Sequence, residues 1–331
     1  MADVSRSPEH WFQVGTVARK LGWYAEAAFS FQEALALRPD FAAAHGELGI
    51  VYALKGEQAN AVKECQKALE LQPRSAAHRR CLGVAYREMG RDEEALRELQ
   101  TAQALAPQEA TTQYELGRTY EKMGQWDRAL LAFEEASELA PQEGLYLYAL
   151  GAAHKKMQNY PQAISTLERV VEMAPQVAEW RDALGELYEI DGRFQSALDQ
   201  YLKAVDLAPQ RAEYHHHAAS VYRQMRRYDK VLEHLKRAIQ LQPGNVRLYA
   251  ELGDANERQK RYEEAEEAYR RLLELEPKEP MHWINLGAIQ EKQDHKREAI
   301  ASFQEALRLG GAYAPAYEHL GRLYEDSGRL A

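Results

Sequence analysis

Residues 110–141 read ATTQYELGRTYEKMGQWDRALLAFEEASELAP, and variants of this stretch recur along the chain every 34 residues. The spacing is marked by Leu-Gly pairs, which begin at Leu48, Leu82, Leu116, Leu150, Leu184, Leu252, Leu286 and Leu320. A series of prolines from Pro39 to Pro277 keeps the same period. A unit of this length is one supersecondary element that cannot bury its apolar face alone, so the period predicts units stacked into a solenoid.

We number each repeat from position 1 to position 34. The repeats begin at residues 8, 42, 76, 110, 144, 178, 212, 246 and 280, and a partial tenth begins at residue 314. Positions 4, 7, 8 and 11 favour a large residue, Leu, Gly and Tyr, while positions 20, 24 and 27 favour Ala, a bulky residue and Ala. Each set falls on one face of a 3.6-residue helix, so every repeat is predicted to be two helices of about 13 residues. Gly at position 15 and Pro at position 32 are expected to end them.

The pattern W-x2-L-G-x2-Y, then A-x3-F, then P, resembles that of the tetratricopeptide repeat family. The resemblance covers residues 8–331 as a single array and leaves residues 1–7 as an N-terminal tail. It implies an all-α solenoid, a right-handed superhelix of antiparallel helix pairs whose first helices line a concave groove. The pentatricopeptide array, which reads RNA, fits badly, because its period is longer, it lacks the regular proline and it is normally basic.

Composition excludes several classes of protein. The formal net charge of −9 argues against a nucleic-acid partner, since neutralising phosphates requires a basic surface. No apolar run approaches the ~18 residues that a membrane span needs. Two cysteines are too few for a disulfide framework, and Cys65 takes core position 24, where we expect it to act as a small buried hydrophobe. A reducing cytoplasm is therefore the expected location.

No catalytic constellation, cofactor loop or zinc helix emerges from the sequence, so we expect neither an enzyme nor a bound cofactor. The run His215-His216-His217 is the only local cluster that resembles a metal site. Consecutive helical residues point about 100° apart, so three adjacent histidines cannot face one ion. His215 falls at position 4 and is expected to pack, while the other two face the groove. No metal site is predicted.

By the family resemblance, positions 2, 5, 6, 9, 12 and 13 line the groove. Successive repeats never place Lys at 5 and Asn at 9 together, so the family's clamp for a C-terminal carboxylate is disfavoured. In repeats three to five these positions hold six basic residues against three acidic ones, an excess of three positive charges. The predicted peptide-binding segment consists of Ile50, Leu54, Arg80, Val84, Arg87, Tyr114, Arg118, Tyr148 and Lys155.

The charge reverses in repeats six to eight, where eight acidic residues stand against three basic ones. The predicted acidic groove segment includes Asp182, Glu186, Glu189, Glu251 and Asp254. Concave surfaces focus such fields, and Arg with Tyr is typical of binding hot spots. The leading hypothesis is thus a scaffold for protein–protein interaction that binds a peptide with acidic and apolar side chains. The alternative is a regulatory or substrate-targeting arm of a larger enzyme.

The C-terminal repeat ends after its first helix, which keeps Tyr317, Leu320, Gly321 and Tyr324 on the face that a second helix covers in other repeats. Two explanations are open: the chain is a fragment of a longer protein, or this face pairs with a second copy to form a homodimer. Repeats seven and eight depart from the pattern, with Arg226 at position 15 and Asn256 at position 11, and are expected to be locally weak.

Overall fold

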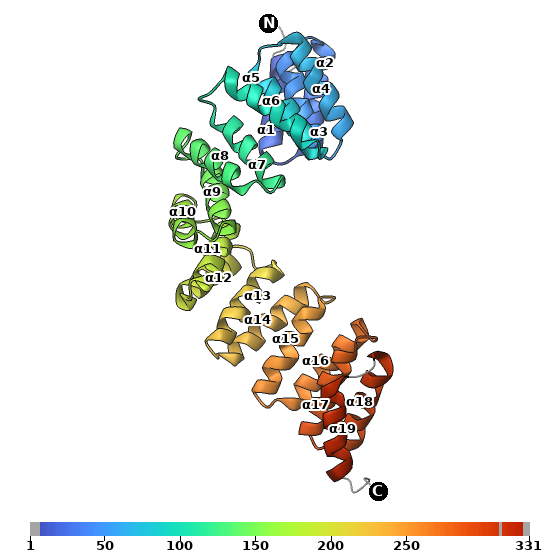
Figure 1. Ribbon diagram of the computed structural model, residues 1–331. Coiled ribbons are helices and arrows are strands. Elements are labelled where there is room, and N and C mark those ends of the chain that lie inside the picture. Colours follow the sequence, from blue (N-terminus) through green and yellow to red (C-terminus); the bar gives the residue numbers. More distant parts are fainter. Residues whose placement is uncertain (1–6, 311–312, 327–331) are drawn as a thin grey trace. The chain divides into compact units, whose positions relative to one another are not determined.

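The computed structural model describes residues 7–310 and 313–326. This described part of the chain forms nineteen α-helices and contains no strand. Figure 1 shows the helices coloured in chain order. The prediction of an all-α fold built from helix pairs is confirmed. Contacts divide the chain into two compact units, residues 1–173 and 174–331, which are described separately. Whether the repeats form one array from residue 8 to residue 331 stays a prediction.

The first unit contains ten helices within its described residues. They are α1 (Pro8–Lys20), α2 (Tyr24–Leu37), α3 (Ala42–Leu54), α4 (Gln58–Leu71), α5 (Ala76–Glu88), α6 (Asp92–Leu105), α7 (Ala110–Lys122), α8 (Trp126–Leu139), α9 (Gly144–Lys156) and α10 (Tyr160–Met173). Each odd-numbered helix is the first helix of a repeat and begins at position 1. Three-residue turns join it to its partner, so the two helices of a pair run antiparallel.

The second unit continues the same alternation over its described residues. Its helices are α11 (Ala178–Ile190), α12 (Phe194–Leu207), α13 (Ala212–Gln224), α14 (Tyr228–Leu241), α15 (Val246–Arg258), α16 (Tyr262–Leu275), α17 (Pro280–Lys292), α18 (Lys296–Gly310) and α19 (Ala314–Asp326). In both units, each second helix packs against the first helix of its own repeat and against that of the next repeat within the unit. Residues 1–6 of the expected tail and residues 327–331 lie outside the described residues.

Helix ends follow from local chemistry. The Ser7 hydroxyl accepts a hydrogen bond from the backbone N–H of His10 at 3.1 Å, which caps α1, and Pro8 occupies the first helical position. Glycine at position 15 adopts positive φ after the first helix in five repeats, as at Gly124 with φ 72°. Four repeats lack this glycine, and the left-handed residue there is Gln158, Arg226, Lys260 or Asp294.

The contact that joins the two helices of a repeat lies between positions 8 and 24. A Cβ added at Gly117 would lie 2.5 Å from Cε1 of Phe133, so only glycine accommodates that ring. The same close approach occurs at Gly15, Gly49, Gly83, Gly151, Gly185, Gly253 and Gly287. Position 20, which is Ala in eight repeats, is at most 2% exposed in every repeat that has a second helix. The close packing therefore requires small residues at two positions and a bulky one between them.

Cys65 is fully buried, as expected, but it is not an isolated hydrophobe. It forms a disulfide with Cys81, which joins α4 of the second repeat to α5 of the third, and the Cα atoms lie 5.8 Å apart. The expectation of two unlinked cysteines was wrong, because the packing of α4 on α5 brings together residues 16 apart in sequence. Disulfides are typical of oxidising compartments, so this bond does not support the predicted cytoplasmic location, which stays a prediction. In the described part of the chain, no helix is both long and apolar enough to span a bilayer.

Replacing Gly117 by Ala should destabilise the chain, because the new methyl group would overlap the Phe133 ring. We expect a loss of about 1–3 kcal/mol, measured by urea unfolding and by hydrogen exchange of α7 and α8. Gly244→Ala is the control, since nothing lies within 4 Å of a Cβ added there and its φ is not positive. That substitution should leave stability unchanged or raise it by about 0.4–1 kcal/mol. Equal losses in both variants would contradict the packing role of Gly117.

The substitutions Arg226→Gly and Lys260→Gly should each stabilise repeats seven and eight. Both residues are exposed and adopt positive φ, of 56° and 58°, which costs a residue with a Cβ about 1–2 kcal/mol. After the entropy cost of glycine, the net gain should be on the order of 1 kcal/mol. Slower amide exchange over residues 212–279 would report it. The converse substitution, Gly192→Arg, should lower stability, and a gain there would refute the argument.

Candidate functional site

Charged side chains link the first helices of consecutive repeats. Arg19 Nε lies 2.6 Å from Glu47 Oε2, so that position 12 of the first repeat contacts position 6 of the second. The same two positions are joined by Arg87 with Glu115, by Arg223 with Glu251 and by Glu291 with His319. Positions 6 and 12 belong to the predicted groove lining. Part of the groove charge therefore serves to hold one repeat against the next.

Two arginines of the predicted basic segment are occupied in this way. Arg87 is only 8% exposed and is paired with Glu115 and Glu88. Arg80 forms an ion pair with Glu109. By sequence, both arginines are expected to be available to a ligand. Glu109 is not among the predicted groove residues, because it lies in the loop before α7, outside the groove positions.

The apolar members of the segment differ in exposure. Val84 and Tyr114 are each 8% exposed, and the Tyr114 ring stacks on Tyr146 with centroids 5.0 Å apart. Ile50 and Tyr148 are half-buried, whereas Leu54 is 49% exposed at the C-terminal end of α3. Val84 and Tyr114 therefore act mainly as packing residues. Leu54 is the most exposed apolar side chain of the predicted segment.

Three basic side chains remain at the surface, and we call them the basic edge: Arg118, Lys122 and Lys156. Arg118 and Lys122 lie one turn apart on α7, are 48% and 42% exposed, and form ion pairs with Glu121 and Asp92 at 3.1 Å and 3.3 Å. Lys156 holds the position of Lys122 one repeat later, and its Nζ lies 5.7 Å from the centre of the Trp126 ring. Half-buried Lys155 lies next to it on α9. The Tyr114 hydroxyl accepts a hydrogen bond from Arg118 at 3.0 Å, which orients that guanidinium.

Two carboxylates of the predicted acidic segment, Asp182 and Glu251, contact histidines on α13. Asp182 Oδ1 lies 2.7 Å from His217 Nδ1, and both oxygens of Glu251 lie 3.0 Å from His216 Nε2. His215 instead is buried and lies 3.3 Å from His234, so it packs, as expected. Glu189 accepts hydrogen bonds from Tyr201 and Ser220. The three histidines point to different partners, in agreement with the argument from helical spacing.

Neighbouring charges and hydrogen bonds favour the charged forms of His217 and Glu251. Burial lowers the pKa of His217, but the hydrogen bond to Asp182 and the charges of Glu186 and Glu189 outweigh it, so the pKa is raised. Burial likewise opposes the ionisation of Glu251, yet hydrogen bonds from His216 and Arg247 lower its pKa to about 2. Asp254 accepts a hydrogen bond from Arg258 at 2.9 Å. Among the described residues, no group of three or more His, Cys, Asp or Glu is arranged to hold a metal ion.

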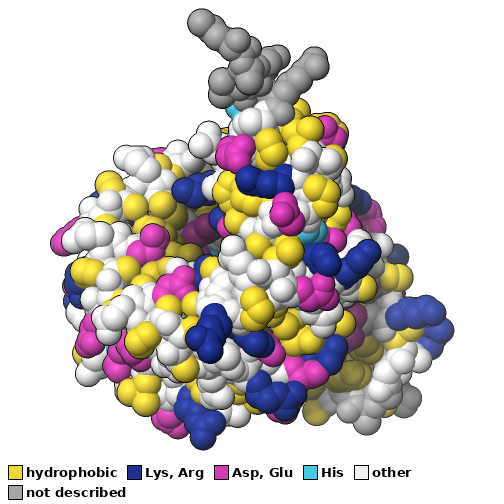
Figure 2. Space-filling view, turned by 90° about the horizontal axis from the view of Figure 1, so that it is seen from above, with side chains coloured by type: hydrophobic (Ala, Val, Ile, Leu, Met, Phe, Trp, Pro, Cys, Tyr) yellow, Lys and Arg dark blue, Asp and Glu magenta, His cyan; other side chains and the backbone are white. Residues whose placement is uncertain are grey.

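Paired charges are also evident on the molecular surface. On the face in Figure 2, Lys and Arg side chains lie near Asp and Glu side chains, with hydrophobic side chains between them. This alternation agrees with the pairing found in both units. A ligand of the groove positions must therefore compete with internal carboxylates, and this holds at the basic edge too, where the ion pairs of Arg118 and Lys122 are exposed rather than buried.

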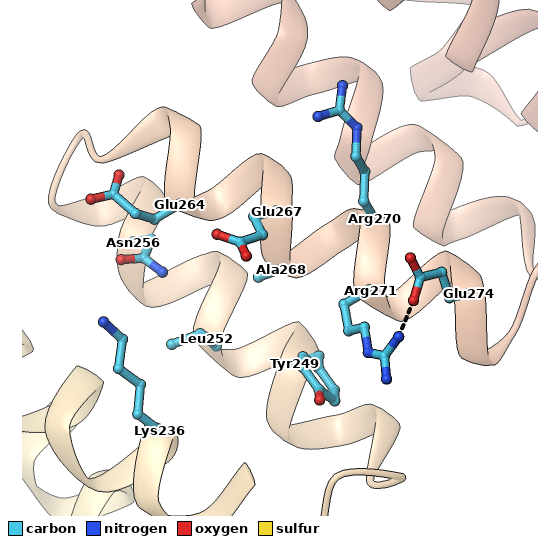
Figure 3. Close-up of a pocket in the computed structure, with 10 residues that line it drawn as sticks. All are labelled: Lys236, Tyr249, Leu252, Asn256, Glu264, Glu267, Ala268, Arg270, Arg271 and Glu274. Carbon is cyan, nitrogen blue, oxygen red and sulfur yellow. Dashed lines mark hydrogen bonds and ion pairs between the residues drawn. The ribbon is translucent and has the colours of Figure 1, made fainter. Parts of the chain in front are cut away.

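A pocket of about 640 Å³ lies between α14, α15 and α16. None of the site residues predicted from the sequence lines it. Figure 3 shows Tyr249, Leu252 and Asn256 of α15 along it, with Lys236 on one side and the charged residues of α16 on the other. Arg271 and Glu274 form an ion pair at its rim. Asn256 takes position 11, where a larger tyrosine is common. That departure was the one signal in the sequence from which the pocket could have been found.

Comparisons with known proteins agree with this architecture. Family models described as tetratricopeptide repeat match residues 14–76, 73–142, 148–212, 217–280 and 283–309. A comparison with curated protein sequences finds no match.

Solved structures share the fold. The APC/C hetero-tetramer Cut9-Hcn1 contains a chain with 14% identity and a TM-score of 0.57; the match covers 98% of the present chain and 57% of that one. PilF of Pseudomonas aeruginosa is 20% identical with a TM-score of 0.56, over 64% of this chain and 95% of its own. YrrB, described as a TPR protein with an unusual peptide-binding site, is 26% identical with a TM-score of 0.49, over 55% of this chain and 94% of its own. Because the family models match well over half of its residues, the chain belongs to the tetratricopeptide repeat family.

Proposed function

We propose that the first-helix face of residues 42–156 binds a peptide segment of a partner protein that carries acidic and apolar side chains. The family's repeats generally serve as non-enzymatic scaffolds for protein–protein interaction. The observation that carries the finer proposal is the basic edge, whose side chains are exposed on the same face as Leu54. An acidic side chain of the ligand meets Arg118 and Lys122, and an apolar one meets Leu54.

The buried arginines have a different part in this proposal. Arg87 and Arg80 hold their carboxylate partners and fix the spacing of α5 and α7, so they shape the face rather than contact the ligand. The Tyr114 hydroxyl accepts a hydrogen bond from Arg118 and so orients its guanidinium. A flexible cation that is oriented in advance loses less conformational freedom on binding. If the chain is the arm of a larger enzyme, this face recruits the substrate of that enzyme.

The test uses 12-residue peptides selected on the wild-type chain from a random phage-displayed library. We expect selection to enrich Asp and Glu together with Leu or aromatic residues. The triple variant Arg118→Glu, Lys122→Glu and Lys156→Glu should weaken binding of the best peptide about tenfold or more in fluorescence anisotropy, because it replaces attraction by repulsion. The effect should shrink at high salt.

A matched control keeps the same net charge. Arg97→Glu, Arg128→Glu and Arg169→Glu reverse three exposed arginines on the second helices α6, α8 and α10. This control should bind like the wild type. Equal loss in both variants, or enrichment of basic peptides, would refute the assignment.

We propose as a second interaction the pairing of two copies through α19. Tyr317 is 57% exposed, and Gly321 has nothing within 4 Å of the place where a Cβ would lie. In eight other repeats a side chain fills this notch at the glycine, Cys65 in the second repeat and Phe, Leu or Tyr in the rest, so the α19 surface can accept one from another chain.

Light scattering of the isolated chain tests the pairing. We expect a dimer that Tyr317→Glu converts to a monomer, because a charge replaces an apolar contact. Leu131→Glu, on the exposed face of α8, is the control and should leave the mass unchanged. A wild-type monomer at high micromolar concentration would exclude pairing through α19.

A further inference from the structure

The first helix of the first repeat presents an apolar face, at positions 7 and 10, that most other repeats bury. Val17 at position 10 is 57% exposed, whereas the position 10 residue of each following repeat is at most 2% exposed. Val14 at position 7 is 39% exposed, while leucines at this position elsewhere, such as Leu48 and Leu286, are nearly inaccessible. In the other repeats this face packs on the second helix of the preceding repeat, as Leu48 and Val51 do on α2. The helix α2 packs on a different face of α1, so Val14 and Val17 remain exposed.

The open face continues into a cleft between α1 and the start of α2. The cleft measures about 480 Å³ and is lined by His10, Gln13, Val14, Val17, Ala18, Trp23 and Glu26. Trp23 is 59% exposed at its edge. Exposed aliphatic and aromatic side chains of this density mark an interaction surface rather than scattered surface hydrophobes.

The sequence of α1 indicates what this face fits. Residues 8–15 read PEHWFQVG, and residues 280–287 at the start of α17 read PMHWINLG, so that Pro, His, Trp and Gly coincide at positions 1, 3, 4 and 8. In α17 the histidine and the tryptophan both contact the preceding repeat. His282 Nε2 lies 2.9 Å from Glu276 Oε2, and Trp283 Nε1 donates to the carbonyl oxygen of Pro277 at 3.2 Å.

These contacts are not particular to one repeat. His78 at position 3 lies 3.1 Å from Gln72, which holds the position of Glu276 in its own repeat. At position 4, His215 and Tyr249 contact the carbonyl oxygens of Pro209 and Pro243, as Trp283 does with Pro277. A first helix with His and a large residue at these positions therefore recognises a helix that ends in Glu-Pro or Gln-Pro.

We propose that the face of α1 formed by His10, Trp11, Val14 and Val17 binds an amphipathic helix of a partner protein in the place of a preceding second helix. The partner helix carries small, bulky and apolar residues with the spacing Ala-x3-Tyr-x2-Leu, and an exit Glu-Pro or Gln-Pro four residues later. Its apolar ridge covers Val14 and Val17, its Glu or Gln meets His10, and its proline carbonyl accepts from Trp11. The binding continues an interface that the chain already forms between its own repeats.

A second copy of the chain does not offer such a helix in its folded state. The residues at positions 20, 24 and 27, which make up the ridge, are at most 4% exposed in all nine second helices of the described chain. The partner helix is therefore one that is free, or becomes ordered on binding. Helices of about 14 residues are only marginally stable alone in water, so binding and helix formation should be coupled.

The test uses the full chain and a peptide of residues 262–277, YEEAEEAYRRLLELEP, which is the helix that covers α17. We expect a fluorescently labelled peptide to bind and to gain helical circular dichroism. Val17→Glu should weaken binding about tenfold or more, since the charge would be buried without a partner. His10→Ala should give a smaller loss, and that loss should vanish with a peptide that carries Glu276→Ala.

The controls separate this face from the rest of the surface. Leu131→Glu places the same charge at a residue that is 65% exposed on α8, and it should bind the peptide like the wild type. A peptide with Leu272→Glu and Leu273→Glu should not bind.

Retained binding in Val17→Glu, or no binding to the wild type, would overturn the proposal. Self-association that Val17→Glu abolishes, without peptide binding, would assign the face to a second copy instead. The triple variant of the basic edge should bind this peptide normally, which distinguishes this proposal from the function proposed above.

Discussion

The contact between a glycine on the first helix and a bulky side chain on the second is the constraint on which the repeat depends. At Gly117 and Phe133, and in seven other repeats, even one methyl group would overlap the facing side chain. The bulky residue is itself nearly inaccessible, and the residues at positions 20 and 27 on either side of it, mostly alanines, are buried as well. Because this arrangement recurs every 34 residues, each repeat presents its first helix in the same way, and position along the helix decides which side chains can meet a partner.

Along the first helices, charge has two roles. Side chains at positions 6 and 12 join neighbouring repeats, and Arg87 is nearly buried in doing so. Exposed members of the same face, such as Arg118 and Lys122, form ion pairs at the surface and are the ones proposed to contact a ligand. A buried pair and an exposed cation differ in what they contribute: the pair fixes the distance between helices, whereas the exposed cation contributes to recognition and association rate.

The interfaces between repeats also indicate what the outer faces of α1 and α19 can recognise. First helices contact the preceding repeat through positions 3, 4, 7 and 10, and in α1 Val14 and Val17 of this set are exposed. At α19, nothing among the described residues lies within 4 Å of a Cβ added at Gly321. Because a solenoid buries its apolar surface through neighbouring repeats, the shape of such an exposed face is specified by the matching faces of the other repeats.

The helical pairs, the start of each first helix and the buried positions follow from the amino-acid sequence alone, since they depend on the period of Leu, Gly, Ala and Pro and on the local chemistry of residues such as Ser7. The sequence pattern also places His215 in the core and separates it from its two neighbours. The pairing of the groove charges depends instead on how the helices pack, because Arg80 meets Glu109, a residue outside the repeat positions that line the groove. The same is true of the Cys65–Cys81 bond, which joins two repeats through positions 24 and 6, and of the pocket beside Asn256. Periodicity specifies the face on which a side chain lies, but contacts between helices depend on the distance and direction that packing sets.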